Sequence, residues 1–179
     1  YSLNSSYFFL IFSIFLNIFL FNNINNLFNC FISSIIILSF YSLISVLLMP
    51  VGFSICLYIV ILVTVMDVFA YIGGNVLGKI KIVPNISKGK TVEGTLIGLI
   101  VTIITSVFVK EIVNLDTYQA VFIGGLIGIM AFFGDLIISL LKRKNHVKDS
   151  GNIIPGHGGL LDRCDGYILI LPILGIFYF

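Results

Sequence analysis

The sequence predicts an all-α, polytopic membrane helix bundle with about six transmembrane helices. Of the 179 residues, 59% are hydrophobic and only 10% are charged, whereas soluble domains carry about 25% charged residues. Polar segments also interrupt the apolar sequence at intervals near the ~20 residues that a helix needs to cross a bilayer. The predicted spans are residues 3–21, 27–49, 51–72, 94–109, 119–141 and 160–179.

The first apolar segment has no basic N-terminal region and no small-residue cleavage site. We therefore interpret residues 1–21 as a membrane span rather than a signal peptide. Asp67 is the first charged residue of the chain, so the first two spans carry no charged group.

Basic residues gather in two of the predicted loops, 75–92 and 142–159. Alternation of spans places these loops on the same side of the bundle. Because cytoplasmic loops carry an excess of Lys and Arg, we expect both loops at the cytoplasmic face of a multi-pass protein in the cell (inner) membrane. A net charge of +2 is too small to indicate a nucleic-acid partner.

Polar side chains share one face of the predicted span 119–141. Asp135 lies about six residues before its end, and Ser139 and Lys142 follow at i+4 and i+7, which places all three on one helix face. Charge at membrane depth is costly and usually functional. An internal ion pair at a helix end is the simpler alternative, and the sequence leaves it open.

Two more acids, Asp162 and Asp165, begin the last predicted span. Carboxylates in a first helical turn are also favoured by the helix dipole. Acids from two helices at one depth nevertheless suit a hard divalent cation, since Mg²⁺ prefers one or two carboxylates together with phosphates and water. Asp135 and Asp162 are the candidate metal ligands.

The segment 155–159, Pro-Gly-His-Gly-Gly, leads into these acids. Free backbone N–H groups before a helix form an anion site, although a plain interhelical turn would also use glycine. His157 fits a phosphate ligand, an acid–base group or a turn residue equally well. The candidate substrate-binding residues in this part of the chain are Ser139, Arg143, Lys148, His157, Gly158, Gly159 and Arg163.

A second polar region begins at Asp67, near the end of the third predicted span, and continues to the Gly-Lys-Thr triplet at 89–91. The triplet resembles the end of a P-loop, but the first glycine of that motif would fall at Pro84, so the motif fails. Ser87, Lys90 and Thr91 still offer hydroxyls and an ammonium for phosphate. Acids for a metal and bases for phosphates together indicate phosphoryl or nucleotidyl transfer.

Three motifs carry a resemblance to phosphatidate cytidylyltransferases, also called CDP-diglyceride synthases. The longest is S-x-x-K-R-x-x-x-x-K-D-x-G-x-x-x-P-G-H-G-G-x-x-D-R-x-D at 139–165, and it is similar to the signature of that family. The upstream D-x-x-A-Y-x-x-G-x-x-x-G-K at 67–79 and S-x-x-K-T-x-E-G at 87–94 also resemble it. The chain differs at 87–91, where Ser-Pro-Lys-Lys-Thr is common in the family, and it is shorter at its N-terminus.

The resemblance implies condensation of CTP with phosphatidic acid to give CDP-diacylglycerol and pyrophosphate. It implies Mg²⁺, with K⁺ as a candidate second ion, and a homodimer. The family's metal aspartates match Asp135 and Asp162, and we assign Lys142, Asp165 and Asp67 as catalytic. On this basis residues 1–59 are N-terminal spans, and 60–179 are the catalytic transmembrane region.

Two alternatives remain at this stage. One is a CTP-dependent polyprenol or isoprenoid-lipid kinase or cytidylyltransferase. The other is a transporter that uses Asp67 and Asp135 as a cation or proton relay, although a transporter has no need of the clustered 156–165 motif.

Overall fold

The computed structural model describes residues 27–84, 86, 87, 89–144, 147 and 164–173. Within this part of the chain all regular elements are helices, and the β-structure consists of an isolated bridge between Lys81 and Thr91. The predicted all-α class is confirmed for these residues. The predicted span 3–21 lies outside them.

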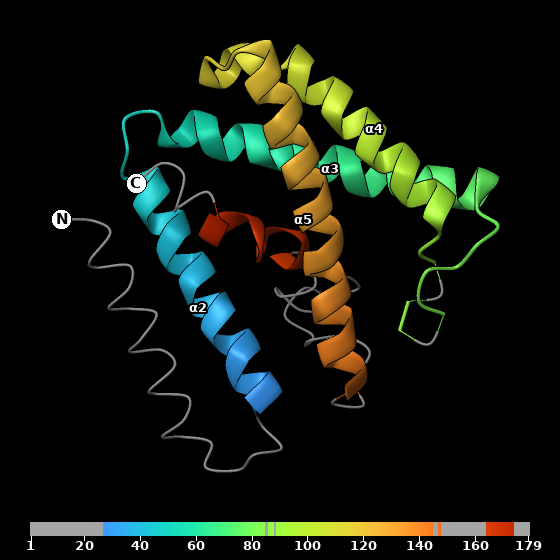
Figure 1. The fold of residues 1–179 in the computed structure, drawn as a ribbon. Helices are drawn as coiled ribbons and strands as arrows, with labels where there is room; N and C mark the ends of the chain where they lie inside the picture. The colour runs from blue at the N-terminus through green and yellow to red at the C-terminus, as the bar shows by residue number, and fades with distance from the viewer. Residues whose placement is uncertain (1–26, 85, 88, 145–146, 148–163, 174–179) are drawn as a thin grey trace, which may run out of the picture.

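The helices follow one another along an apolar chain (Figure 1). They are α2 (Leu27–Leu47), α3 (Gly52–Leu77), α4 (Val92–Phe108), the 3-10 helix η2 (Lys110–Val113), α5 (Thr117–Lys144) and the 3-10 helix η3 (Asp165–Tyr167).

Two of the described helices, α3 and α5, are long and apolar enough to cross a membrane. α4 has 17 residues, or about 26 Å at 1.5 Å per residue, which is short of a hydrocarbon core of about 30 Å. α2 has 21 residues, or about 32 Å by the same measure. By length and composition, α3 and α5 are the candidate spans among the described residues, and the expected number of six remains a prediction.

α3 packs along α4, and α5 crosses α3 and also contacts α4 (Figure 1). Glycines allow the backbones to touch: a Cβ built on Gly94 of α4 would lie 2.4 Å from the carbonyl oxygen of Ala70 in α3. Small residues at such contacts are typical of helix packing in membranes. Gly73 is buried in this seam, and α3 continues as a helix to Leu77. The predicted loop start at residue 75 is therefore wrong, because the tight contact with α4 keeps the glycine segment helical.

A buried polar chain joins the same three helices. The side-chain oxygens of Tyr58 in α3 and Ser106 in α4 lie 2.6 Å apart. Ser106 also donates to the carbonyl oxygen of Ala120 in α5. Since a serine hydroxyl has one proton, Tyr58 must be the donor to Ser106.

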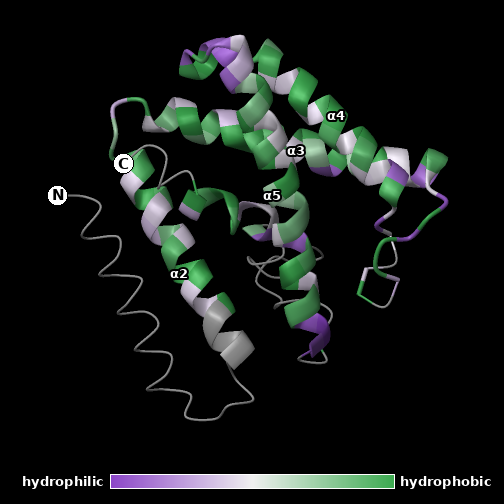
Figure 2. Ribbon diagram, in the orientation of Figure 1, coloured by the Kyte–Doolittle hydropathy of each residue, from purple (hydrophilic) through white to green (hydrophobic). Residues whose placement is uncertain are grey.

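The helices are hydrophobic along most of their lengths, and hydrophilic residues gather in three places: the α3–α4 loop, the segment from η2 to the start of α5, and the C-terminal end of α5 (Figure 2). On α4 the exposed large side chains recur every four residues, at Leu96, Ile100, Ile104 and Phe108, so they form one stripe. A stripe of this kind is costly in water and stable against lipid or another apolar helix.

Candidate active site

Charged side chains from four segments meet beside the crossing of α3 and α5. Asp67, Asp135 and Asp165, from α3, α5 and η3, lie close enough to interact electrostatically. Lys90 of the α3–α4 loop and Lys142 of α5 lie near the same acids. We call these residues and Ser139 the acid cluster. Six of the predicted site residues are therefore brought together.

Asp135 is held through both carboxylate oxygens. Its Oδ2 lies 2.7 Å from the Nζ of Lys90, and its Oδ1 accepts a hydrogen bond of 3.2 Å from the hydroxyl of Ser139. The Asp135–Ser139 contact agrees with the predicted common face. The ion pair left open by the sequence is present, but its cation comes from the α3–α4 loop, 45 positions away in the chain, rather than from Lys142 on the same helix face.

Asp165 reaches the cluster because α5 has a glycine opposite it. A Cβ built on Gly134 would lie 2.5 Å from the carbonyl oxygen of Asp165. The carboxylate of Asp165 accepts a hydrogen bond of 2.9 Å from the N–H of Gly166. Gly134 therefore sets the distance between Asp165 and the neighbouring Asp135.

The loop that carries Lys90 is held by backbone hydrogen bonds on both sides of that residue. The N–H of Ile82 donates to the carbonyl of Lys90 at 3.1 Å, and the N–H of Val92 donates to Ile80 at 2.9 Å. Thr91 is the N-cap of α4, and its buried hydroxyl accepts from the N–H of Gly94 at 3.2 Å. Thr91 was predicted to bind substrate, and here its hydroxyl is engaged in the cap.

Glu93 fastens the other end of the loop. Its carboxylate accepts hydrogen bonds from the N–H groups of Lys79, at 3.1 Å, and Ile80. Its own backbone N–H and that of Lys79 lower the pKa of this carboxyl below its usual value. The sequence prediction gave Glu93 no role, although the residue belongs to the motif at 87–94.

The two basic loops touch one another. Arg143, at the end of α5, donates from its Nε to the carbonyl of Ile86 in the α3–α4 loop at 3.2 Å. Ser87 follows Ile86 directly. This contact fits the prediction that both loops lie on one side of the bundle, and which side of the membrane that is remains a prediction.

The remaining predicted residues lie outside the described part of the chain. These are Lys148, His157, Gly158, Gly159, Asp162 and Arg163. The Asp135–Asp162 metal pair and the glycine turn therefore stay predictions. Within the described residues no group of three His, Cys, Asp or Glu side chains has the arrangement of a metal site.

The described acids nonetheless fit a hard cation in their chemistry. Oδ2 of Asp135 already faces a cation, the ammonium of Lys90, and further negative charge comes from Asp67 and Asp165. Carboxylate oxygens are the ligands that Mg²⁺ prefers. Asp135 is the described residue best placed to bind such an ion.

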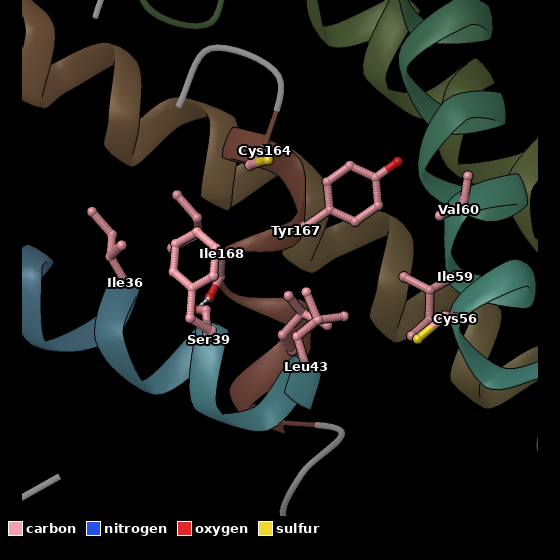
Figure 3. Close-up of a pocket in the computed structure, with 11 residues that line it drawn as sticks. Ile36, Ser39, Leu43, Cys56, Ile59, Val60, Cys164, Tyr167 and Ile168 are labelled. Carbon is pink, nitrogen blue, oxygen red and sulfur yellow. Dashed lines mark hydrogen bonds between the residues drawn. The ribbon is translucent and has the colours of Figure 1, made fainter. Parts of the chain in front are cut away.

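An apolar cavity of about 220 Å³ has in its lining two residues that are close in sequence to Asp165 of the acid cluster, and Figure 3 shows its walls. It opens between α2 and α3, and the segment around η3 crosses it. Cys164 and Tyr167 line the cavity on either side of Asp165 in the sequence. The cavity and Asp165 therefore share the same short segment of backbone.

Apolar helices with carboxylates and ammonium groups gathered at one site are, in the described part of the chain, the features of a helical membrane protein. The chain belongs to the cytidylyltransferase family, whose family model matches residues 2–179.

Curated relatives agree with this assignment. The chain is 43% identical over 129 residues to the uncharacterized protein YnbB of Escherichia coli (strain K12), an alignment that covers 72% of this chain and 43% of YnbB. It is 41% identical over 127 residues to a phosphatidate cytidylyltransferase of Staphylococcus haemolyticus, an alignment that covers 70% of this chain and 49% of the relative. It is 41% identical over 125 residues to a phosphatidate cytidylyltransferase of Helicobacter pylori, an alignment that covers 69% of this chain and 47% of the relative. The chain spans about half the length of these relatives.

Proposed function

We propose that this chain carries the catalytic transmembrane region of an enzyme that condenses CTP with phosphatidic acid to give CDP-diacylglycerol and pyrophosphate. The observation that carries the proposal is the meeting of Asp67, Lys90, Asp135, Lys142 and Asp165 at one site in a member of the cytidylyltransferase family. Acids and ammonium groups side by side are what a reaction between two phosphate compounds requires.

The lipid phosphate is ionised near neutral pH, so it attacks the α-phosphorus of CTP without a protein nucleophile. A P–O bond forms between the two, and the bond to the β-phosphate breaks in line, so that pyrophosphate leaves with its electron pair. Lys142 and Arg143 hold phosphate oxygens through charge-assisted hydrogen bonds. The same role falls to Lys148 and Arg163, and the backbone N–H groups at Gly158 and Gly159 approach the phosphates.

Asp135 and Asp162 would hold Mg²⁺, which supplies neutralisation of phosphate charge when bound. Ser139 orients Asp135 for this purpose by its hydrogen bond to Oδ1. Asp67 and Asp165 add negative charge around the same position. K⁺ is the candidate second ion.

The apolar cavity suits one acyl chain of the lipid. Its walls come from α2 and α3, while Cys164 and Tyr167 connect it to Asp165. A phosphate at the acid cluster therefore leaves a neighbouring apolar space for the attached chain. The enzyme would work at the cytoplasmic face of the cell membrane, where CTP is available. The resemblance to dimeric enzymes supports a homodimer.

The test is turnover by the purified full chain in lipid nanodiscs with phosphatidic acid and CTP labelled either in the cytidine or at the γ-phosphate. Cytidine label in the lipid product and γ-label in pyrophosphate are expected. Transfer of γ-label to the lipid, with release of CDP, would instead identify a CTP-dependent lipid kinase. Asp135→Asn should abolish turnover. Lys110→Gln is the control, because Lys110 donates a hydrogen bond of 2.9 Å to Thr117 at the start of α5, away from the cluster.

A further inference from the structure

The second carboxylate oxygen of Asp135 is occupied by a cation that belongs to the protein. Lys90 and Asp135 are held 2.7 Å apart with side-chain exposures of 16% and 32%. The Nζ of Lys90 is buried and makes no hydrogen bond to any other atom of the described chain. It lies 5.0 Å from the centre of the Phe132 ring, an aromatic face that favours a cation.

A divalent ion bound to Oδ2 would lie about 2.1 Å from it, within the space that the ammonium takes up. Two cations at one oxygen repel each other, and the effect is strong where the surroundings are partly buried. Binding of the ion therefore requires Lys90 to leave.

We propose that Lys90 is a built-in counter-cation that occupies Asp135 until a divalent ion arrives and is then displaced. The displacement needs only a side-chain movement, because the backbone around Lys90 is held by its bond from Ile82 and by the Thr91 cap. Lysine suits this role, since it carries a compact charge on a flexible four-carbon stem. Resting on the proposed function, the displaced ammonium would then bind a phosphate oxygen of a substrate.

The proposal makes two statements that can be separated by experiment. Lys90 and the divalent ion compete for Asp135 whether or not CTP or lipid is present. The phosphate contact matters only during turnover. Lys90→Met should therefore strengthen ion binding and weaken catalysis, which a lysine with a purely structural role would not do.

The experiment is titration of the purified full chain with Mn²⁺, followed by electron paramagnetic resonance, without nucleotide or lipid. Lys90→Met should bind Mn²⁺ about tenfold more tightly than the wild type, within the 5–150-fold range typical of coupled sites. Lys90→Arg should bind Mn²⁺ as weakly as the wild type, and Asp135→Asn should not bind Mn²⁺. Lys81→Met is the matched control, because it removes the same charge from an exposed position of the same loop and should change binding less than about twofold.

Unchanged or weaker binding by Lys90→Met would overturn the proposal, as would an equal gain in Lys81→Met, which would indicate a general charge effect. If Lys90→Met is unfolded without divalent ions, added Mn²⁺ should restore its melting transition by replacing the missing cation; failure to restore it also overturns the proposal. Because the readout uses no substrate, a missing CDP-diacylglycerol product would refute the proposed function while leaving this competition intact.

Discussion

Replacing Gly134 with alanine should separate catalysis from stability. The added Cβ would lie 2.5 Å from the carbonyl oxygen of Asp165, so the two segments must move apart by several tenths of an ångström up to about 1 Å, at a cost of about 1–3 kcal/mol for overpacking. Alanine in a helix regains up to about 1 kcal/mol over glycine. The fold should therefore survive with a modest loss of stability.

Catalysis should fall much further, because Asp165 would be displaced relative to Asp135. A misplacement of about 1 Å at a reacting centre costs about 10²-fold in rate. The assay is CDP-diacylglycerol formation at saturating CTP, together with melting temperature in detergent.

Gly125→Ala is the matched control in the same helix. Its Cβ would meet only the side chain of Ile103, at 3.7 Å, which is ordinary contact. The gain in helix propensity from glycine to alanine is the same in both variants. The difference between them in activity and melting temperature therefore reports the clash with Asp165 alone. Equal activity of the two variants would refute the argument that Gly134 positions Asp165.

Four further predictions concern the metal site, the loop beside it, the apolar cavity and the membrane topology. Asp162→Asn should lower Mg²⁺-dependent turnover by about 10³-fold or more, or about 4 kcal/mol of transition-state stabilisation; normal activity across a Mg²⁺ titration would exclude Asp162 as a ligand. Hydrogen bonding lowers the pKa of Glu93, so this carboxylate stabilises the fold at pH values above the ordinary carboxyl pKa, and the stabilisation is lost as pH falls through the lowered pKa. Glu93→Gln should therefore have a lower melting temperature than the wild type at pH 7, and the difference should vanish in acid. Ile59→Trp, which fills the apolar cavity, should slow turnover of long-chain phosphatidic acid more than turnover of a dioctanoyl form. Equal slowing of both substrates would show that the cavity does not hold the acyl chain. A single introduced cysteine at Lys81 should resist membrane-impermeant reagents in intact cells, whereas labelling from outside would reverse the predicted orientation.

Sequence patterns predicted the elements of this molecule better than its contacts. The ~20-residue apolar period and the polar interruptions located α3, α4 and α5 within a few residues, because burial in lipid imposes a minimum length. The predicted end of α3 was wrong, because consecutive glycines indicate a loop when the helix that packs against them is unknown. In the structure Gly73 is helical and packs closely against α4, where a Cβ built on it would lie 3.3 Å from the Cα of Gly94.

Within the site, the spacing of Asp135 and Ser139 on one helix was sufficient to predict their contact. The partner of Asp135 could not be predicted, since Lys79, Lys81, Lys88, Lys90 and Lys142 all lie in or beside the basic loops. Only the course of the backbone, set by Glu93 and the Thr91 cap, selects Lys90. The Gly134–Asp165 approach was equally hidden, because a single glycine inside an apolar helix has no distinguishing pattern.

The hydrogen-bonded chain through Tyr58, Ser106 and Ala120 has a consequence for how the helices are aligned along their lengths. A slip of one residue moves a helix by 1.5 Å along its axis and turns it by about 100°, which would take Ser106 away from both partners. No water is available in an apolar interior to replace the lost bonds. Tyr58 precedes Asp67 by nine residues, or about 14 Å along α3. A tyrosine with no part in the chemistry thus sets the axial register that brings Asp67 level with Asp135.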